Sequence, residues 1–311
     1  MTKVSRMYYE NGLLQSEIAA ALNLSQAKVS RLLKRASKVG IVRTTVLVAP
    51  GLHTELEEAL EKRYQLRDAL VVDVEPGASD EVAINAIGGG AAGYLEEYLS
   101  GGSERIGISS WSRTLSAAID RMRPARTKAA AQVVQMLGGF GTRNRQNDAQ
   151  RMLVELASHL QAESVSVNAP GVVTTKEIRD ALMQEDQMKE VQKHWRELTF
   201  ALVGIGCVQP SGVLLDSGNT YPMEERSRLI EEGAIGNVCH NYFTADGTHI
   251  QDELSERTIA ISAEDLVRIP RRIALAGGPE KHEVIKAALN GGWVNVLITD
   301  SDTAAYLIRE D

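Results

Sequence analysis

Short apolar runs alternate with amphipathic helical patterns from residue 68 to the carboxyl end of this chain. The runs typical of buried strands are 69–72, 105–108, 132–136, 164–167, 200–205, 272–276 and 294–298. Helical patterns lie between most of them, at 80–99, 149–160, 280–289 and 303–309. Strands that are apolar on both faces and separated by helices indicate a mostly parallel sheet covered by helices on both sides. The predicted fold class is therefore α/β.

The charge of the chain is divided unevenly along its length. Residues 1–50 carry eight Lys or Arg and two acids, a net charge of +6, whereas residues 51–311 carry 26 Lys or Arg and 39 Asp or Glu, a net charge of −13. No acid occurs between Glu17 and Glu55. Clustered basic side chains attract a phosphate backbone whatever the charge of the whole chain. The amino end is therefore a candidate DNA-binding segment.

Three short helices are expected in this basic segment, at 4–10, 15–22 and from residue 26 onward. Asn11-Gly12 and Asn23-Leu24 are turn signals, and Ser25 suits the N-cap position of the third helix. Its apolar residues Val29, Leu32, Leu33 and Ala36 follow helical spacing. Two helices joined by a tight turn, the second with a basic free face, predict a helix-turn-helix.

The second helix of such a motif enters the major groove with its first residues nearest the base edges. We expect base contacts from Gln26, Lys28 and Arg31, and phosphate contacts from Lys34, Arg35 and Lys38. A solvated surface helix is the alternative, but the acid-free window and the turn spacing favour DNA. The predicted DNA-binding residues are Gln15, Ser25, Gln26, Lys28, Ser30, Arg31, Lys34 and Arg35.

A domain boundary is expected at Ala49-Pro50-Gly51, after a β-branched strand pattern at 41–48. It separates a DNA-binding domain at 1–50 from a ligand-binding and oligomerisation domain at 51–311. The charged helical pattern at 53–65 is read as a linker helix or a dimer contact. Cys207 and Cys239 form no CxxC pattern, and neither an export signal nor a membrane-spanning run is found, which predicts a cytoplasmic protein.

The turns after several predicted strands are rich in small and polar residues. Open α/β sheets bind ligands at the edge where the carboxyl ends of their strands meet. Ser109–Thr114 opens a helix, and its N–H groups, hydroxyls and Arg113 suit a phosphate, although an ordinary Ser-rich N-cap explains the segment equally well. Gly138-Gly139 and Gly204-Ile205-Gly206 end two other strands. Lys281 lies in the first turn of a helix, where it opposes the helix dipole, and is interpreted as a ligand contact.

Together these motifs resemble the SorC family of bacterial transcriptional regulators, a branch of the DeoR-type sugar-responsive repressors and activators. The resemblance covers nearly the whole chain. It depends on Met7–Ala19 and Val29–Ala36 in the basic segment, and on Ile106–Leu115, Gly204–Gly206, Gly233–Cys239, Ala276–Lys281 and Val294–Asp300 in the remainder.

The resemblance implies a second domain similar to ribose-5-phosphate isomerase and glucosamine-6-phosphate deaminase, used to sense a sugar, a polyol or a phosphosugar. It also implies a homodimer or homotetramer on double-stranded operator DNA, with Ser109–Thr114 as phosphate loop and Lys281 on the ligand. Ser112, Asn237 and Thr244 depart from the family pattern, so the identity of the effector does not carry over. The predicted effector-binding residues are Ser109, Ser110, Trp111, Ser112, Arg113, Thr114, Gly138, Gly139, Gly206, Asn237, Asp246 and Lys281.

A sugar-phosphate isomerase or deaminase with an appended DNA-binding domain is the alternative function. Such an enzyme needs a general base paired with an acid, for which Asp216, Asp246, Glu280 and Asp300 are candidates. Each also suits the role of a turn or helix cap. The histidines show no HExxH or other metal-ligand spacing, and no GxxxxGK[ST] phosphate loop occurs. The predicted function is therefore a regulator without catalysis, metal or cofactor.

Overall fold

The computed structural model describes residues 1–39, 41–42, 53–75, 77–99, 101–109, 112–139, 143–208 and 223–309. The chain forms two compact units, Met1–Ala49 and Pro50–Asp311. Ser110, Trp111, Asp216 and nearly all of the strand expected at 41–48 lie outside the described residues.

The smaller unit consists of the helices α1 (Thr2–Tyr9), α2 (Gln15–Leu22) and α3 (Gln26–Lys38). Its core is formed by the buried side chains of Val4, Ile18, Ala19, Val29 and Leu33. Asn23 ends α2 in the left-handed conformation, with φ of 51°, and the hydroxyl of Ser25 accepts a hydrogen bond of 3.2 Å from the N–H of Lys28. The three predicted helices and the Ser25 N-cap are therefore confirmed.

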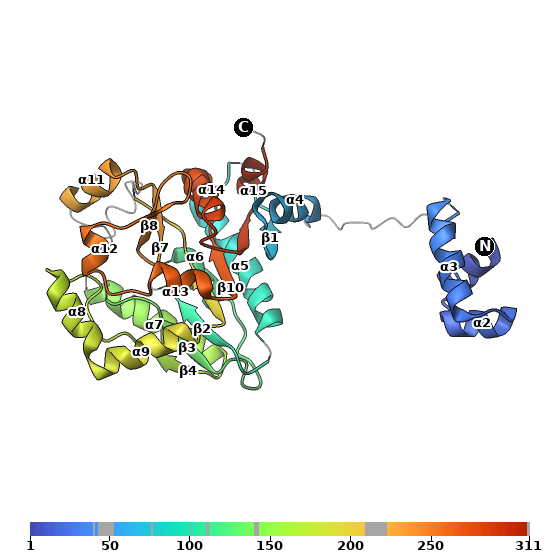
Figure 1. The fold of residues 1–311 in the computed structure, drawn as a ribbon, viewed down its shortest axis with the longest axis horizontal. Helices are drawn as coiled ribbons and strands as arrows, with labels where there is room; N and C mark the ends of the chain where they lie inside the picture. The colour runs from blue at the N-terminus through green and yellow to red at the C-terminus, as the bar shows by residue number, and fades with distance from the viewer. Residues whose placement is uncertain are drawn as a thin grey trace. The chain divides into compact units, whose positions relative to one another are not determined.

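The larger unit is built on a sheet of seven strands in the order β1-β11-β10-β5-β2-β3-β4. Figure 1 labels β1, β10, β2, β3 and β4 of this sheet. Every neighbouring pair in this sheet is parallel. Each strand corresponds to one of the predicted apolar runs. The strands are β1 (Asp68–Val72), β2 (Arg105–Ile108), β3 (Gln132–Gln135), β4 (Glu163–Val165), β5 (Phe200–Val203), β10 (Arg271–Leu275) and β11 (Val296–Asp300).

Helices cover both faces of this sheet. One buried cluster joins Ile106, Leu202 and Ile298 to the helices α5 (Asp80–Tyr98), α6 (Arg113–Ile119) and α7 (Arg143–His159). A second cluster joins Ala201 and Leu297 to the opposite helices, α4 (Thr54–Tyr64), α9 (Asp186–Arg196), α13 (Ala263–Arg268), α14 (His282–Asn290) and α15 (Ser301–Leu307). The mostly parallel α/β fold predicted from the sequence is confirmed.

A second, antiparallel sheet was not predicted. It contains β6 (Gly206–Cys207), β7 (Gly236–Val238), β8 (Asn241–Phe243) and β9 (His249–Ile250). Strands of two or three residues are too short to show a periodic pattern. The turn between β7 and β8 uses Cys239 and His240, with φ of 51° and 59°, where Asn-Gly is the usual signal.

The remaining helical segments are α8 (Lys176–Gln184), α11 (Met223–Glu231), α12 (Glu253–Arg257) and the 3₁₀ turn η1 (Pro279–Lys281). Among the described residues, no helix combines the length and the apolar character that crossing a membrane requires.

Candidate functional site

The strand order has a topological switch point between the carboxyl ends of β2 and β5, the position at which α/β sheets form a ligand-binding crevice. After β2 the chain continues to β3 and β4 on one side, whereas after β5 it continues to β10 and β11 on the other side. Loops that leave neighbouring strands in opposite directions open a ligand-binding crevice in α/β sheets. The polar turns predicted after these strands therefore meet at one edge, as expected for parallel pairing.

The loop from β2 to α6 forms one wall of this crevice. Ser109 is buried, and its hydroxyl accepts a hydrogen bond of 3.3 Å from the N–H of Gly204, which follows β5. Ser112 is the N-cap of α6 and accepts from the N–H of Leu115 at 3.2 Å. The backbone N–H groups of the first helical turn lie at the positive end of the helix dipole, where an anion is stabilised. Arg113 is exposed and Thr114 is buried beside these groups.

Lys281 closes the crevice from the side of β10. Its ammonium Nζ donates a hydrogen bond of 3.0 Å to the carbonyl of Ile205, in the turn after β5. Burial lowers the pKa of Lys281; Arg113 lowers it further, and Cys207 and Asp80 oppose the shift. A partly buried ammonium with a neutral partner is costly for the free protein, and charged groups with a lowered or raised pKa are enriched at functional sites.

Gly206 and Asn237 lie together beside this lysine. They pair across β6 and β7, and a Cβ on Gly206 would stand 2.8 Å from the side-chain nitrogen of Asn237. Cys207 follows directly, and burial raises the pKa of its thiol. Neither Asp80 nor Cys207 was predicted to belong to the site, since each lies in an element whose position depends on the tertiary fold.

Three other predicted effector contacts, Gly138, Gly139 and Asp246, do not lie beside Lys281 with free polar groups. The N–H groups of Gly138 and Gly139 donate to the carbonyls of Ile259 (2.9 Å) and Ala169 (2.8 Å), so they are occupied within the protein. Asp246 lies in the turn between β8 and β9, next to the carboxyl end of α14, whereas Lys281 precedes the amino end of that helix. Hydrogen bonds from Thr244 and Thr248 lower the pKa of Asp246.

The carboxylates considered for an enzyme are mostly engaged in structural roles. Asp300 is 2% exposed and accepts hydrogen bonds from the N–H groups of Gly278 (2.9 Å) and Thr303 (2.7 Å), together with the Thr303 hydroxyl. Asp246 caps its own turn, and Glu280 is exposed. Within the described part of the chain, no group of three or more His, Cys, Asp or Glu side chains could hold a metal ion.

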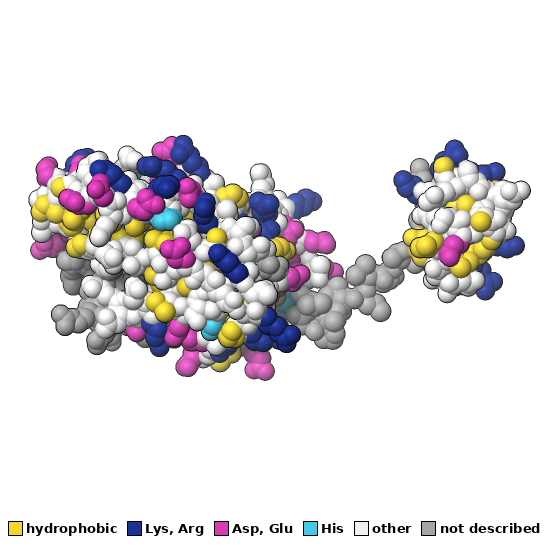
Figure 2. Space-filling view, turned by 90° about the horizontal axis from the view of Figure 1, so that it is seen from below, with side chains coloured by type: hydrophobic (Ala, Val, Ile, Leu, Met, Phe, Trp, Pro, Cys, Tyr) yellow, Lys and Arg dark blue, Asp and Glu magenta, His cyan; other side chains and the backbone are white. Residues whose placement is uncertain are grey.

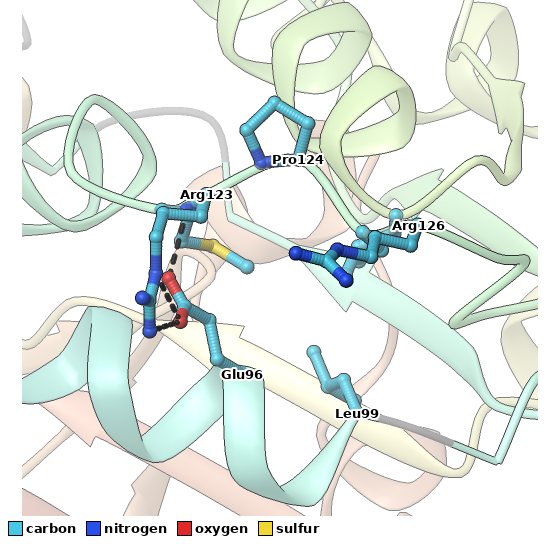
Figure 3. A pocket seen from close by; sticks show the side chains of 8 residues that line it. Glu96, Leu99, Arg123, Pro124 and Arg126 are labelled. Carbon is cyan, nitrogen blue, oxygen red and sulfur yellow. Dashed lines mark hydrogen bonds and ion pairs between the residues drawn. The ribbon is translucent and has the colours of Figure 1, made fainter.

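A cavity of about 440 Å³ opens at the opposite, amino edge of the sheet (Figure 3). It lies where the helices α5, α6 and α7 end, between Glu96, Leu99, Arg123 and Leu160. Three hydrogen bonds of 2.7–3.0 Å join Arg123 to the carboxylate of Glu96 and lower the pKa of Glu96. This cavity is therefore separate from the site around Lys281. The charges of Arg123 and Glu96 neutralise each other there, and Arg126 adds a further cation.

The smaller unit presents a basic helix face. Gln26, Lys28, Arg31, Lys34 and Arg35 are all exposed on α3, whereas the apolar side of that helix is buried. The other predicted DNA contacts are partly exposed or exposed, at Gln15, Ser25 and Ser30. Basic side chains stand on several sides of this unit, whereas acidic and basic side chains are mixed over the larger one (Figure 2). The side chain of Lys38 lies outside the described residues.

Known transcriptional regulators are similar to this chain in sequence and in fold. The Sugar-bind family model, which describes a sugar-binding domain, matches residues 50–309. The sorbitol operon regulator of Klebsiella pneumoniae is 29% identical over 314 residues, which cover 99% of this chain and 97% of that protein. The deoxyribonucleoside regulator of Bacillus subtilis is 29% identical over 309 residues, covering 99% and 96%.

The crystal structure of the full-length sorbitol operon regulator SorC from Klebsiella pneumoniae resembles this fold with a TM-score of 0.74. That match has 27% sequence identity and covers 99% of this chain and 98% of the other. The agreement therefore extends over both units and not only over the sheet. The chain belongs to the SorC family of sugar-responsive transcriptional regulators.

Proposed function

We propose that a phosphorylated sugar or polyol binds in the crevice between β2 and β5 and controls the affinity of this regulator for DNA. The observation that carries the proposal is the partly buried ammonium of Lys281, which donates to the carbonyl of Ile205 in the turn after β5 and lies near Arg113. The phosphate would lie at the start of α6, against backbone N–H groups and the side chains of Ser112, Arg113 and Thr114. Asn237 and Gly206 would contact the sugar hydroxyls.

The smaller unit would act as a helix-turn-helix that reads operator DNA in the cytoplasm. Gln26, Lys28 and Arg31 would contact bases, and Lys34 and Arg35 would hold phosphates, because α3 exposes all five of them. The larger unit would resemble the sugar-phosphate isomerases in fold and join copies of the chain into a dimer or tetramer. By binding both the effector and operator DNA, the protein would regulate a carbohydrate or polyol catabolic operon.

The hydrogen bonds of the candidate carboxylates favour a sensor, which binds its ligand without converting it, over an enzyme. A general base must reach the proton that it removes, but Asp300 is held by hydrogen bonds to its own loop and helix. Asp246 lies at the far end of α14 and is engaged by its own turn. Lys281 and Arg113 therefore supply cations, and the start of α6 supplies hydrogen-bond donors, which bind an anion. Of the carboxylates considered for catalysis, Asp300 and Asp246 are engaged elsewhere. The carboxylate of Asp80 acts on Lys281.

A thermal-shift screen against sugars, polyols and their phosphates tests this proposal. A compound that binds only the native state raises the melting temperature, by an amount that grows with ligand concentration. We expect a shift from a phosphorylated compound and its loss in Lys281→Met. Lys189→Met is the matched control because Lys189 lies on the surface of α9, paired with Asp186. An equal shift in Lys281→Met, or consumption of the compound during incubation, would contradict the proposal.

A further inference from the structure

The helix α4, the first described after the DNA-binding unit, is fastened along the edge strand β1. The carboxylates of Glu57 and Glu61 accept hydrogen bonds from the backbone N–H groups of Val71 (2.9 Å) and Ala69 (3.2 Å). These bonds close an edge that would otherwise expose unpaired backbone groups. They also fix the direction of α4, whose amino end lies at the carboxyl edge of the sheet. The helix that leads to the DNA-binding unit therefore begins at the edge that holds the candidate effector site.

The carboxyl end of α4 is joined to the end of α15. The hydroxyl of Tyr64 donates a hydrogen bond of 2.8 Å to the carbonyl of Leu307. The guanidinium of Arg63 donates to the carbonyls of Ile308 (3.1 Å) and Arg309 (2.7 Å). These carbonyls lie in or just after the last turn of α15, where they lack partners inside the helix. A displacement of α15 therefore breaks or strains its bonds to α4.

The start of α15 is joined in turn to residues 276–281, which connect β10 to α14 and are called the Lys281 loop. The N–H of Gly278 donates to both the carboxylate of Asp300 and the hydroxyl of Thr303, at 2.9 Å each. Asp300 also caps α15, and Thr303 is fully buried. A Cβ on Gly277 would come within 2.0 Å of the Asp300 carboxylate, so the loop lies directly against this network. Buried polar groups of this kind have no solvent to replace a lost partner.

We propose that the Lys281 loop, α15 and α4 form one cooperative unit, through which occupancy of the effector site reaches the helix that leads to DNA. The inference rests on the proposed effector site. An anion that draws Lys281 away from the carbonyl of Ile205 shifts the loop, and Gly278 carries that shift to Asp300 and Thr303. The chain of contacts then runs along α15 to Tyr64 and Arg63 on α4.

Amide hydrogen exchange in the full chain without ligand tests this connection. Thr303→Val removes the hydroxyl used by Gly278 but keeps the volume of the side chain and the Asp300 cap. We expect about fivefold faster exchange at 278–281, and also in α4, because local opening would spread through the unit. Tyr64→Phe should have the reciprocal effect and speed exchange in the loop, since coupling between two sites is mutual.

Thr258→Val is the matched control. Thr258 is also buried, and its hydroxyl donates a hydrogen bond of 2.7 Å to Leu254, but it lies outside this chain of contacts. It should leave exchange in the loop and in α4 unchanged. Faster exchange in the loop of Thr303→Val, with α4 as in the unmodified protein, would overturn the proposal.

Inorganic phosphate serves as the probe for the ligand arm of the experiment. It should slow exchange in both the loop and α4 of the unmodified protein, but only in the loop of Thr303→Val. Protection of the loop alone in the unmodified protein would overturn the connection. Protection of neither segment would count against the effector site, while the ligand-free result would still decide whether the loop and α4 are coupled.

Discussion

Lys281 determines the electrostatics of the candidate effector site. Its side chain is partly buried and its ammonium donates to a neutral carbonyl, and burial is the main reason that its pKa is lowered. A bound phosphate dianion would stabilise the charged form and raise the pKa again. Binding is then linked to proton uptake by this one side chain, which gives the site a measurable signature.

The affinity for a phosphorylated effector should therefore fall at alkaline pH. Because binding raises the pKa of Lys281, the full affinity is present below the pKa of the free protein and is lost as pH rises through the pKa of the complex. Each pKa unit by which binding raises the value corresponds to about a tenfold loss of affinity. A phosphate monoester is mostly dianionic above pH about 7, so its own ionisation adds little there. Titration calorimetry between pH about 7 and 10 measures this dependence.

Lys281→Arg provides the control, because an arginine stays charged throughout this range. Any binding that it retains should not decline as pH rises. A decline of equal slope in Lys281→Arg would assign the pH dependence to another group.

Among the elements, α5 and α6 pack closely against each other. A Cβ placed on Gly88 of α5 would stand 2.8 Å from both the backbone carbon and the Cβ of Ala117 in α6. Close packing, and not the binding of a phosphate, therefore accounts for Gly88 in the Gly88-Gly89-Gly90 run. The contact positions α6, whose first turn forms a wall of the crevice.

Gly88→Ala should destabilise the larger unit by about 1–3 kcal/mol, because the backbone of α6 must move to admit the methyl group. Gly93→Ala is the control on the same helix, since a Cβ at Gly93 meets nothing within 4 Å. This second change should stabilise by about 0.5–1 kcal/mol through helix propensity. Urea denaturation of both variants measures the difference. Equal stability of the two variants would show that α5 and α6 can separate at no cost.

The elements that the sequence predicts are those with a strong local signal. The strands of the parallel sheet coincide with apolar runs in the sequence, although β4 itself is short and mostly exposed, and helices such as α2 and α5 follow amphipathic patterns bounded by turn residues. The four short strands β6 to β9 lack such a pattern, since tertiary pairing alone makes them strands. In the site, the polar turns after β2 and β5 were predictable because parallel strands end at one edge. The approach of Asp80 and Cys207 to Lys281 was not, because it depends on the spatial order of the strands.

At the scale of the whole molecule, the two units divide charge as well as structure. The net charge is +6 over residues 1–50 and −13 over residues 51–311. Attraction to DNA is therefore concentrated in a unit of three helices with a small core. Under the proposed function, one such unit would read one half-site, and two copies held together would read both half-sites of an operator. Under the proposed function, the larger unit supplies that connection.

A fragment of residues 1–50 should therefore bind operator DNA much more weakly than the full chain. Joining two DNA-binding modules raises affinity by about 10²–10⁴ over that of one module, without any new contact to the DNA. The measurement uses fluorescence anisotropy with duplexes selected from a random pool by the full chain, at one fixed salt concentration. The full-length Arg31→Ala variant should also lose affinity, by about 1–3 kcal/mol per half-site, if this residue contacts a base. Arg6→Ala should not, because Glu10 holds that guanidinium on α1. A fragment that matches the affinity of the full chain would show that the larger unit does not join DNA-binding units on the operator.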